Sequence, residues 1–272
     1  MLLTVITILS ALLAVGFPLG MGWTWWASLP LFVGSFLGLL LLAVAGLCLL
    51  CALVDLDKPQ EEDSPVYRFF MHLYIDLLLT IGRVHIRMEG MEQLPKDGRF
   101  LLVCNHQDDS DPALILHAFP KSQLAFISKK ENRTMFAVGK FMHMTLCQMI
   151  DRENDREALK TILKCIQLIE EDKVSIAVFP EGGIKVKGKL SPFRSGVFKI
   201  AQKANVPIVV CTLKGSTYLI RNVLHGKSAH VRLRLLDVIP AEELKGVKTT
   251  DIAQRVHDLM QADLGEEFRL EE

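Results

Sequence analysis

The first 54 residues form a long apolar stretch that contains no Asp, Glu, Lys, Arg or His. Two apolar runs, 2–16 and 31–54, are separated by a segment rich in proline, glycine and tryptophan, namely Pro18, Gly20, Gly22, Trp23, Trp25 and Trp26. The second run is long enough to cross a bilayer, and indole rings prefer the membrane interface. The pattern therefore predicts a transmembrane hairpin of two hydrophobic helices over residues 1–54, broken from Pro18 onward, with the tryptophans at the far interface.

Residues 55–82 predict a polar linker followed by an amphipathic helix. Between residues 65 and 81, the apolar side chains fall mainly on one wide stripe, whereas Arg68, His72 and Asp76 lie off it. Such a helix suits the membrane interface, and it equally suits packing against the core of the following domain. The sequence leaves both placements open.

From residue 84 onward, short apolar runs alternate with amphipathic segments. The expected strands are 84–89, 100–104, 124–128, 145–150, 174–179, 206–213 and 229–238, and the expected helices are 111–117, 131–144, 154–171, 194–204 and 249–264. Strands that alternate with helices are typical of an α/β fold. We therefore predict one α/β domain over residues 83–272, with a mostly parallel central sheet flanked by helices.

The composition excludes several classes of function and of site. The chain has 31 basic and 31 acidic residues, so a nucleic-acid partner is not expected. The six cysteines are scattered, which predicts reduced thiols and no disulfide framework. Because no Cys/His cluster has the spacing of a zinc site, we also expect no metal.

The positions of Lys and Arg predict how the hairpin is oriented. The segment between the two apolar runs carries no basic residue, whereas Arg68, Arg83 and Arg87 follow the second run. Basic residues near membrane spans remain on the cytoplasmic side. We therefore expect an integral membrane protein in which residues 83–272 face the cytoplasm.

Polar residues follow five of the expected strands. They are residues 105–111, Lys129-Lys130, Asp151-Arg152, 180–183 and Lys214-Gly215. Ligands of open α/β sheets bind outside the carboxyl ends of the strands. We therefore expect these five segments to share one crevice.

The first of these segments contains a candidate base. His106 lies at the exit of an apolar strand and Asp111 follows it by five residues, an arrangement that suits a base and the carboxylate that orients it. Asp108 and Asp109 are rival carboxylates within reach. Asp111 also suits the start of the next helix, because Pro112 comes directly after it.

Four motifs in this region resemble those of the glycerolipid acyltransferases, the family that includes 1-acylglycerol-3-phosphate acyltransferase. Asn105-His106 with Asp111 resembles the NHxxxxD motif, and residues 149–152, 179–182 and 206–209 resemble the second, third and fourth motifs. Their order and spacing agree from residue 84 to about 215, and the apolar N-terminal helices resemble those of membrane-bound members. Four motifs in order are far more specific than any one of them.

The resemblance implies direct transfer of an acyl group from a thioester to a glycerol hydroxyl. His106 would remove the hydroxyl proton, and Asp111 would fix the histidine tautomer and stabilise the imidazolium. No acyl-enzyme is expected, because no Ser or Cys lies in a nucleophile-elbow context. Asp111 is preferred over Asp108 and Asp109 because it alone has the family spacing.

Binding of a phosphorylated acceptor requires fixed positive charge. Arg152 is the first candidate, because a guanidinium binds phosphate through two hydrogen bonds, and a surface ion pair is the alternative. Lys129 and Lys130 would meet the phosphates of the acyl donor, unless they are simply solvated. The expected substrate-binding residues are Asn105, Lys130, Arg152, Glu181, Gly182, Gly183 and Lys185.

The third motif departs from the family pattern. Gly183-Ile184 stands where the family has Thr-Arg, so an arginine expected to bind phosphate is missing. Candidates to replace it follow closely, namely Lys185, Lys187, Lys189 and Arg194. Either one of them compensates, or the acceptor has a different head group.

These features together predict an acyltransferase of phospholipid biosynthesis that converts 1-acylglycerol-3-phosphate to phosphatidic acid. The expected partners are the lysophospholipid acceptor and an acyl-CoA or acyl carrier protein co-substrate, and no cofactor is expected. The alternatives are acylation of a different lysophospholipid, a hydrolase, and a catalytically silent membrane scaffold with the same fold.

Overall fold

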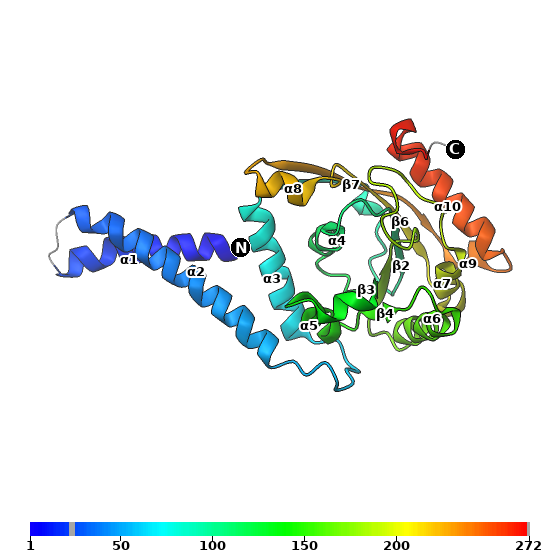
Figure 1. Ribbon diagram of the computed structural model, residues 1–272, viewed down its shortest axis with the longest axis horizontal. Coiled ribbons are helices and arrows are strands. Elements are labelled where there is room, and N and C mark those ends of the chain that lie inside the picture. The colour runs from blue at the N-terminus through cyan, green and yellow to red at the C-terminus, as the bar shows by residue number, and fades with distance from the viewer. Residues whose placement is uncertain (22–24, 271–272) are drawn as a thin grey trace.

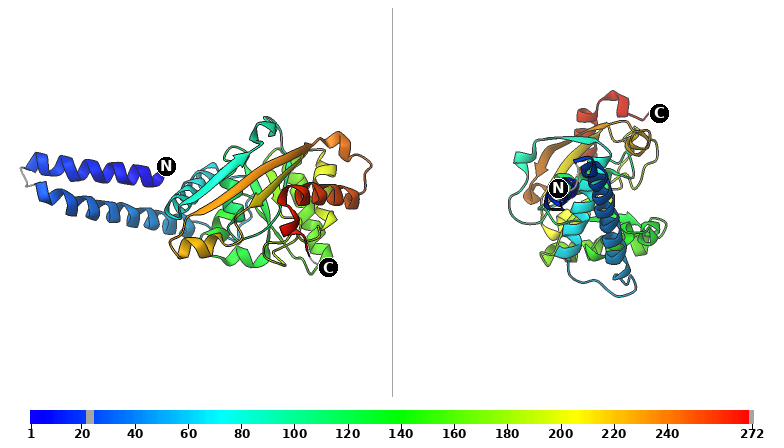
Figure 2. Two further views of the ribbon diagram at one scale, coloured as in Figure 1. Left: turned by 90° about the horizontal axis from the view of Figure 1, so that it is seen from above. Right: turned by 90° about the vertical axis from the view of Figure 1, so that its left-hand side faces the viewer.

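The computed structural model describes residues 1–21 and 25–270 of the chain, and two apolar helices come first. Helix α1 spans Leu2–Met21 and α2 spans Ser28–Ala52, with the 3₁₀ turn η1 (Trp25–Ala27) before α2. The two helices lie side by side and project from the rest of the molecule (Figures 1 and 2). Both are long and apolar enough to cross a membrane, and most of their surface is free of contact with the rest of the chain.

The structure corrects one detail of the predicted hairpin. Helix α1 continues through Pro18 to Met21, so no break occurs at the proline. Pro18 lies in the last turn, where it removes a single backbone hydrogen bond. An earlier break would leave more backbone groups unsatisfied in apolar surroundings, which costs more. Of the predicted turn, Gly22 and Trp23 lie outside the described residues, and Trp26 is exposed.

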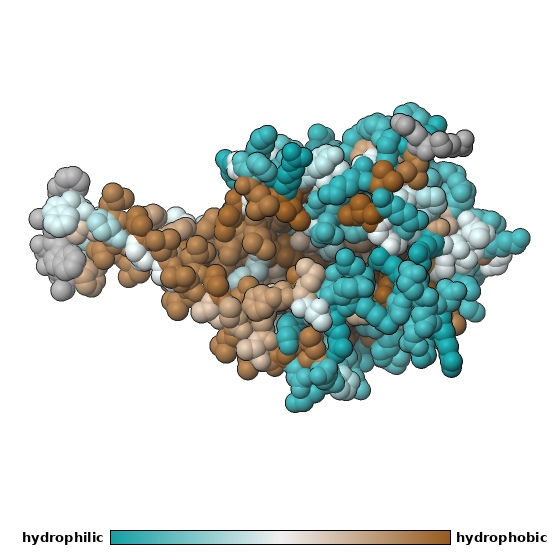
Figure 3. Space-filling view, viewed as in Figure 1, coloured by the Kyte–Doolittle hydropathy of each residue, from teal (hydrophilic) through white to brown (hydrophobic). Residues whose placement is uncertain are grey.

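Helix α3 spans Pro65–Ile81, as predicted, and joins the hairpin to the domain. Ser64 caps it by accepting a hydrogen bond from the Tyr67 amide, and Pro65 occupies the first turn. One side packs on the core, while apolar side chains on the other side remain exposed, namely Val66, Phe69, Leu78 and Ile81. The apolar surface of the hairpin therefore continues onto the adjoining side of the domain, whereas the opposite side is hydrophilic (Figure 3).

Seven strands form one mixed sheet in the order β1-β7-β6-β2-β5-β3-β4. Their bounds are Val84–Glu89, Leu101–Cys104, Leu124–Lys129, Gln148–Ile150, Ser175–Val178, Ile208–Lys214 and Ala229–Ile239 for β1 to β7. Strands β6, β2, β5, β3 and β4 run parallel, and β7 pairs antiparallel with β6. The prediction of a mostly parallel α/β sheet is confirmed, with β1 and β7 as the strands that run in the opposite direction.

Helices cover both faces of this sheet (Figure 1). Side chains of the central strands alternate between the faces, so Leu102 and Cys104 of β2 join one core while Leu101 and Val103 join the other. The first core includes α3, α4 (Asp111–Ala118), α5 (Val138–Met144) and α8 (Leu219–Leu224). The second includes α6 (Asp155–Glu170), α7 (Lys199–Ala204), α9 (Ala241–Leu244) and α10 (Thr249–Leu264). Further 3₁₀ turns are Met91–Gln93, Lys130–Thr134, Ser195–Phe198 and Glu266–Phe268.

The predicted helix 131–144 is wrong in its first half. The chain forms the 3₁₀ turn Lys130–Thr134 and begins α5 only at Val138, with Ala137 at φ 58° between them. The backbone folds back so closely that a Cβ at Gly139 would lie 1.9 Å from the Arg133 carbonyl oxygen. Only glycine fits there, and this tertiary contact overrides the helical pattern.

Arg68 of α3 is buried at the junction between the helix and the sheet. Its guanidinium pairs with Asp63 at 2.6 Å and donates to the Leu124 carbonyl at 3.0 Å, and both charged side chains are more than 90% buried. A buried charge that loses its partner destabilises a fold much more than an exposed one does. Arg68 therefore fastens α3, and with it the hairpin, to the domain.

Replacing Arg68→Met is expected to lower the free energy of unfolding by about 3–5 kcal/mol, because it leaves Asp63 buried without its partner. Far-UV circular dichroism during urea unfolding in detergent measures this loss. Arg87→Met is the matched control, since Arg87 pairs with Glu89 at 2.8 Å on the exposed surface and should cost less than about 1 kcal/mol. Equal shifts for the two variants would contradict the role of Arg68.

Candidate active site

The carboxyl ends of five parallel strands meet at one edge of the sheet. Strands β2, β3, β4, β5 and β6 all point the same way, so the polar segments that follow them lie along this edge. The predicted position of these segments at one edge is confirmed, and a crevice shared by all five stays a prediction. The site is described below from its candidate base outward.

His106 and Asp111 form a close pair in the loop after β2. The His106 Nδ1 atom lies 2.9 Å from Asp111 Oδ2, and Asp111 is fully buried while His106 remains partly accessible. The same Oδ2 also accepts the backbone N–H groups of Gln107 at 2.6 Å and Asp108 at 2.9 Å. A carboxylate oxygen surrounded by donors makes Nδ1–H the donor in the pair, which leaves Nε2 free to accept a proton.

The two rival carboxylates have other environments. Asp108 Oδ1 accepts hydrogen bonds from the backbone and the hydroxyl of Ser110 at 3.1 and 2.7 Å. Asp109 is exposed to solvent. The geometry therefore selects Asp111 as the partner of His106, as its spacing predicts.

Glu181 connects the His106 loop to the loop that follows β5. Its Oε1 accepts the His106 backbone N–H at 2.7 Å and its Oε2 accepts the Ser191 N–H at 2.9 Å. Burial raises the pKa of Glu181 to about 7, although both N–H donors favour the charged form. Because both of its oxygens are occupied by the backbone, Glu181 positions His106 in the structure, and direct acceptor binding by its side chain stays a prediction.

Phe179, at the end of β5, stacks on the histidine. The two ring centroids lie 4.2 Å apart with planes 15° from parallel, and Phe126 lies against Phe179 at 5.8 Å. The stack restricts rotation of the imidazole and covers one of its faces. The sequence contains Phe179 in the third motif, but nothing in the sequence indicates this contact.

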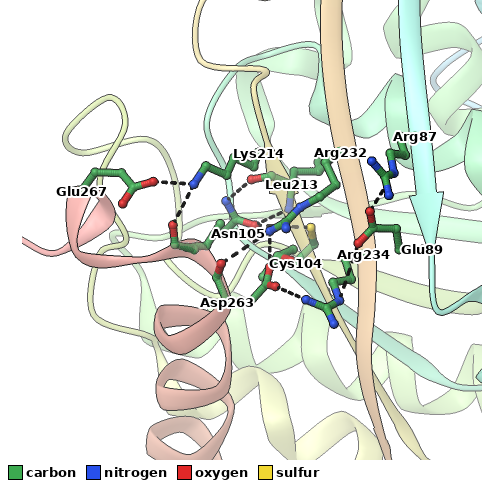
Figure 4. Close-up of polar contacts among 12 residues, drawn as sticks. Arg87, Glu89, Cys104, Asn105, Leu213, Lys214, Arg232, Arg234, Asp263 and Glu267 are labelled. Carbon is green, nitrogen blue, oxygen red and sulfur yellow. Dashed lines mark hydrogen bonds and ion pairs between the residues drawn. The ribbon is translucent and has the colours of Figure 1, made fainter.

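Asn105 fixes the beginning of the same loop. Its side chain donates to the Leu213 carbonyl at 2.9 Å and accepts the Leu213 N–H at 2.7 Å, and it is fully buried (Figure 4). With its amide paired to β6, Asn105 positions the loop in the structure, and contact of its side chain with substrate stays a prediction. Pairing of an amide with both backbone groups of a distant strand cannot be read from spacing along the chain.

Strand β6 is in turn held by an aspartate of α10. Asp263 accepts from the Thr212 hydroxyl at 2.6 Å and from Arg232 and Arg234 at 2.7 and 2.8 Å (Figure 4). These contacts join the C-terminal helix to β6 and β7 beside the segment that anchors Asn105. Sequence reasoning missed Asp263, because it lies far from every motif.

Arg152 and Arg194 lie against the Gly182-Gly183 turn. A Cβ at Gly182 would be 2.8 Å from Arg194 Nε, and a Cβ at Gly183 would be 3.0 Å from Arg152 Nη1. Burial lowers the pKa of Arg152, and the positive charge of Arg194 lowers it further. Two guanidinium groups therefore face one loop that is connected to His106 through Glu181.

The two predicted lysines are placed differently. Lys130 forms an ion pair with Asp151 at 2.7 Å on the surface, so its charge is already compensated. The side chain of Lys185 is exposed and forms no hydrogen bond or ion pair within the described residues. Among the described residues, neither lysine forms a hydrogen bond or ion pair with His106 or Asp111, and their contacts with substrate remain predictions. Within residues 1–21 and 25–270, no group of three His, Cys, Asp or Glu side chains is arranged to hold a metal ion.

Comparison with known proteins identifies a matching family and several similar sequences. A family profile described as Acyltransferase matches residues 85–214. A "Probable 1-acyl-sn-glycerol-3-phosphate acyltransferase" of Mycoplasma pneumoniae is 32% identical over 185 residues, covering 65% of this chain and 68% of the relative. The 1-acyl-sn-glycerol-3-phosphate acyltransferase of Saccharomyces cerevisiae is 27% identical over 216 residues, covering 78% of this chain and 68% of the relative.

A solved structure shares the fold. The crystal structure of the 1-acyl-sn-glycerophosphate acyltransferase PlsC from Thermotoga maritima superimposes with a TM-score of 0.62 over 84% of this chain and 90% of that one, at 22% identity. The sequence motifs and the similarity to these relatives indicate the same family. The chain belongs to the acyltransferase family that includes the 1-acyl-sn-glycerol-3-phosphate acyltransferases.

Proposed function

We propose that this acyltransferase moves a fatty acyl group from acyl-CoA or acyl carrier protein to the free hydroxyl of 1-acylglycerol-3-phosphate, giving phosphatidic acid. The single observation that carries the proposal is the His106–Asp111 pair at 2.9 Å, with the His106 ring partly accessible. The names of the relatives supply the acceptor. The donor follows from the chemistry of acyl transfer, which requires an activated acyl group such as a thioester.

The proposed reaction needs one base and one acid, and His106 serves as both. Its Nε2 takes the proton of the acceptor hydroxyl as the hydroxyl oxygen attacks the thioester carbonyl. The new C–O bond forms, the tetrahedral intermediate collapses, and the C–S bond breaks. The imidazolium then returns its proton to the departing thiolate, and Asp111 stabilises the imidazolium in between.

Transfer without an acyl-enzyme is supported by the surroundings of the nearest thiol. Cys104 immediately precedes the motif, but it is fully buried in β2, and burial raises the pKa of its thiol well above the ordinary value. A buried neutral thiol is a poor nucleophile. The acceptor hydroxyl is therefore the nucleophile in the proposed reaction.

We further propose that the protein is anchored in the membrane by α1 and α2, with the domain on the cytoplasmic side. The exposed apolar surface of both helices supports insertion, because most of it is not covered by the residues that the structure describes. The absence of basic residues from the segment between the apolar runs supports the orientation. A lipid acceptor would then reach the site from the bilayer.

Replacing His106→Ala is expected to reduce acyl transfer about 10²- to 10⁴-fold, the contribution of a positioned general base. The matched control is His117→Ala, because His117 pairs with Asp76 at 2.7 Å outside the site and should not affect transfer. Mass spectrometry of the products is the measurement, with a panel of lysolipids and with acyl-CoA and acyl carrier protein compared.

The outcomes of this panel separate the alternatives. Phosphatidic acid from the wild type but not from His106→Ala supports the proposal. Equal activity of both proteins would remove the catalytic assignment, and a product only from another lysolipid would change the acceptor. Free fatty acid without an acylated lipid would favour a hydrolase. No product from any combination of lysolipid and acyl donor would favour a catalytically silent scaffold.

Glu181 is expected to make the fold less stable as the pH rises from about 4.5 to 7. Its pKa is raised from 4.5 to about 7 by burial, so in this window the folded state retains a proton that the unfolded state has released. The contribution is fully present below pH 4.5 and is lost as the pH passes 7. Urea unfolding of the wild type and of Glu181→Gln at several pH values tests this. The free energy of unfolding of Glu181→Gln should fall less steeply between pH 4.5 and 7 than that of the wild type.

Glu267, on the surface, provides a control for the pH dependence of stability attributed to Glu181. The pKa of Glu267 is lowered from 4.5 by its hydrogen bond to Lys214, so Glu267 is ionised in both states above that pH. Glu267→Gln should therefore leave the slope between pH 4.5 and 7 unchanged and alter the pH dependence only below pH 4.5. A slope that is the same in Glu181→Gln and the wild type would show that the carboxyl is already ionised throughout this range.

A further inference from the structure

The third motif of this chain lacks the arginine that the family pattern places after Glu-Gly, and Ile184 occupies that position. A site for a phosphorylated acceptor nevertheless needs positive charge close to His106. The candidates in the chain are the lysines of the loop and Arg194. The structure distinguishes between them by what each side chain contacts.

The Gly182-Gly183 turn is in contact with two guanidinium groups. Gly182 has φ 74° and Gly183 has φ 131°, conformations that favour glycine. Because neither glycine has a side chain, an arginine can lie close to each of them. A Cβ atom at Gly182 would be 2.8 Å from Arg194 Nε, and one at Gly183 would be 3.0 Å from Arg152 Nη1. A threonine at 183, as in the family pattern, would strain the backbone and would require the end of the Arg152 side chain to shift.

Neither guanidinium forms an ion pair within residues 1–21 and 25–270, although the charge of Glu131 partly offsets that of Arg152 from a distance. Arg68, Arg99 and Arg232 each pair with an aspartate, whereas the side chains of Arg152 and Arg194 form no hydrogen bond or ion pair among these residues. Like charges that face one loop repel each other, and the charge of Arg194 adds to the larger effect of burial in lowering the pKa of Arg152. An anion with two charges would relieve this repulsion and accept a fork of hydrogen bonds from each arginine.

We propose that Arg152 and Arg194 together bind the phosphomonoester of the acceptor, with Arg194 supplying the charge that the family pattern places at position 184. The inference rests on the proposed function. It explains why the two departures occur together: Gly183 admits Arg152, and Arg194 replaces the arginine lost at 184. It also predicts that a dianionic phosphomonoester is preferred over a lysolipid with a phosphodiester head group.

The acceptor phosphate fits this pair better than the phosphates of the donor do. Arg194 donates its backbone N–H to the Pro180 carbonyl at 2.8 Å, and the adjacent Glu181 accepts the His106 N–H at 2.7 Å. Arg194 and the base are therefore linked through the loop after β5, and Arg152 lies against the same loop. In 1-acylglycerol-3-phosphate the phosphate is on the carbon next to the reacting hydroxyl, whereas the donor's phosphates lie at the far end of the pantetheine arm.

Replacing Arg194→Gln is expected to raise the KM for 1-acylglycerol-3-phosphate about 10- to 100-fold, the effect of one charge-assisted contact, and to leave the KM for the donor unchanged. The KM of Arg194→Lys for 1-acylglycerol-3-phosphate should lie between those of the wild type and Arg194→Gln, because lysine retains the charge but cannot form two parallel hydrogen bonds. The control is Arg156→Gln, which removes another exposed arginine, on α6, without a partner among the described residues. Thermal unfolding of each variant verifies the fold.

Direct binding separates this inference from the proposed function. In the His106→Ala background, calorimetric titration with micellar 1-acylglycerol-3-phosphate should show the same loss of affinity on Arg194→Gln, whether or not the wild type catalyses transfer. Titration with a lysophosphatidylcholine that has the same acyl chain should show weak binding, and Arg194→Gln should not alter that affinity.

Three outcomes would overturn the inference while leaving the proposed function intact. They are an unchanged KM for the acceptor, a raised KM for the donor alone, and an equal loss of affinity for both lysolipids. A wild type that binds 1-acylglycerol-3-phosphate through Arg194 but forms no product would instead overturn the proposed function and leave the binding site in place.

Discussion

The Asp111 carboxylate holds the loop that carries the candidate base. Its Oδ2 accepts the His106 ring N–H and two backbone N–H groups, all within 2.9 Å. One buried oxygen therefore closes the turn after β2 and sets the histidine tautomer at the same time. Such an arrangement is possible only where the carboxylate is shielded from water and the donors converge on it. Asp111 is the first residue of α4, but among the described residues its side chain caps no helical N–H group, so its contacts serve the preceding turn and His106.

The rest of the fold keeps this loop in place from both sides. Asn105 is paired to β6, Glu181 holds the His106 backbone from the β5 side, and Phe179 stacks on the ring. Asp263 fastens α10 to β6 and β7 behind Asn105. Because β2 lies between β5 and β6 in the sheet, the base is supported by its two neighbouring strands. Preorganisation of this kind reduces the reorganisation required during proton transfer.

Local patterns in the sequence predict much of this structure, and contacts between distant segments account for the remainder. Periodicity predicts α3 and α10 to the residue, and the His106–Asp111 spacing predicts their pairing. The break before α5 follows from the close approach of Gly139 to Arg133, which no local pattern encodes. Arg68 is polar and lies off the apolar stripe of its helix, yet it is buried, because Asp63 and backbone carbonyls from two other segments meet it there. The position of Arg194 likewise depends on how the loop after β5 folds back.

Asp111→Asn tests the central contact most directly. Asparagine retains the shape and an oxygen for the Gln107 and Asp108 amides, but it removes the charge that favours the Nδ1–H tautomer and the imidazolium. The account predicts that kcat falls about 10²- to 10⁴-fold while the KM for 1-acylglycerol-3-phosphate changes little, because Asp111 is fully buried and acts through His106. A kcat equal to that of the wild type in a correctly folded Asp111→Asn protein would contradict it.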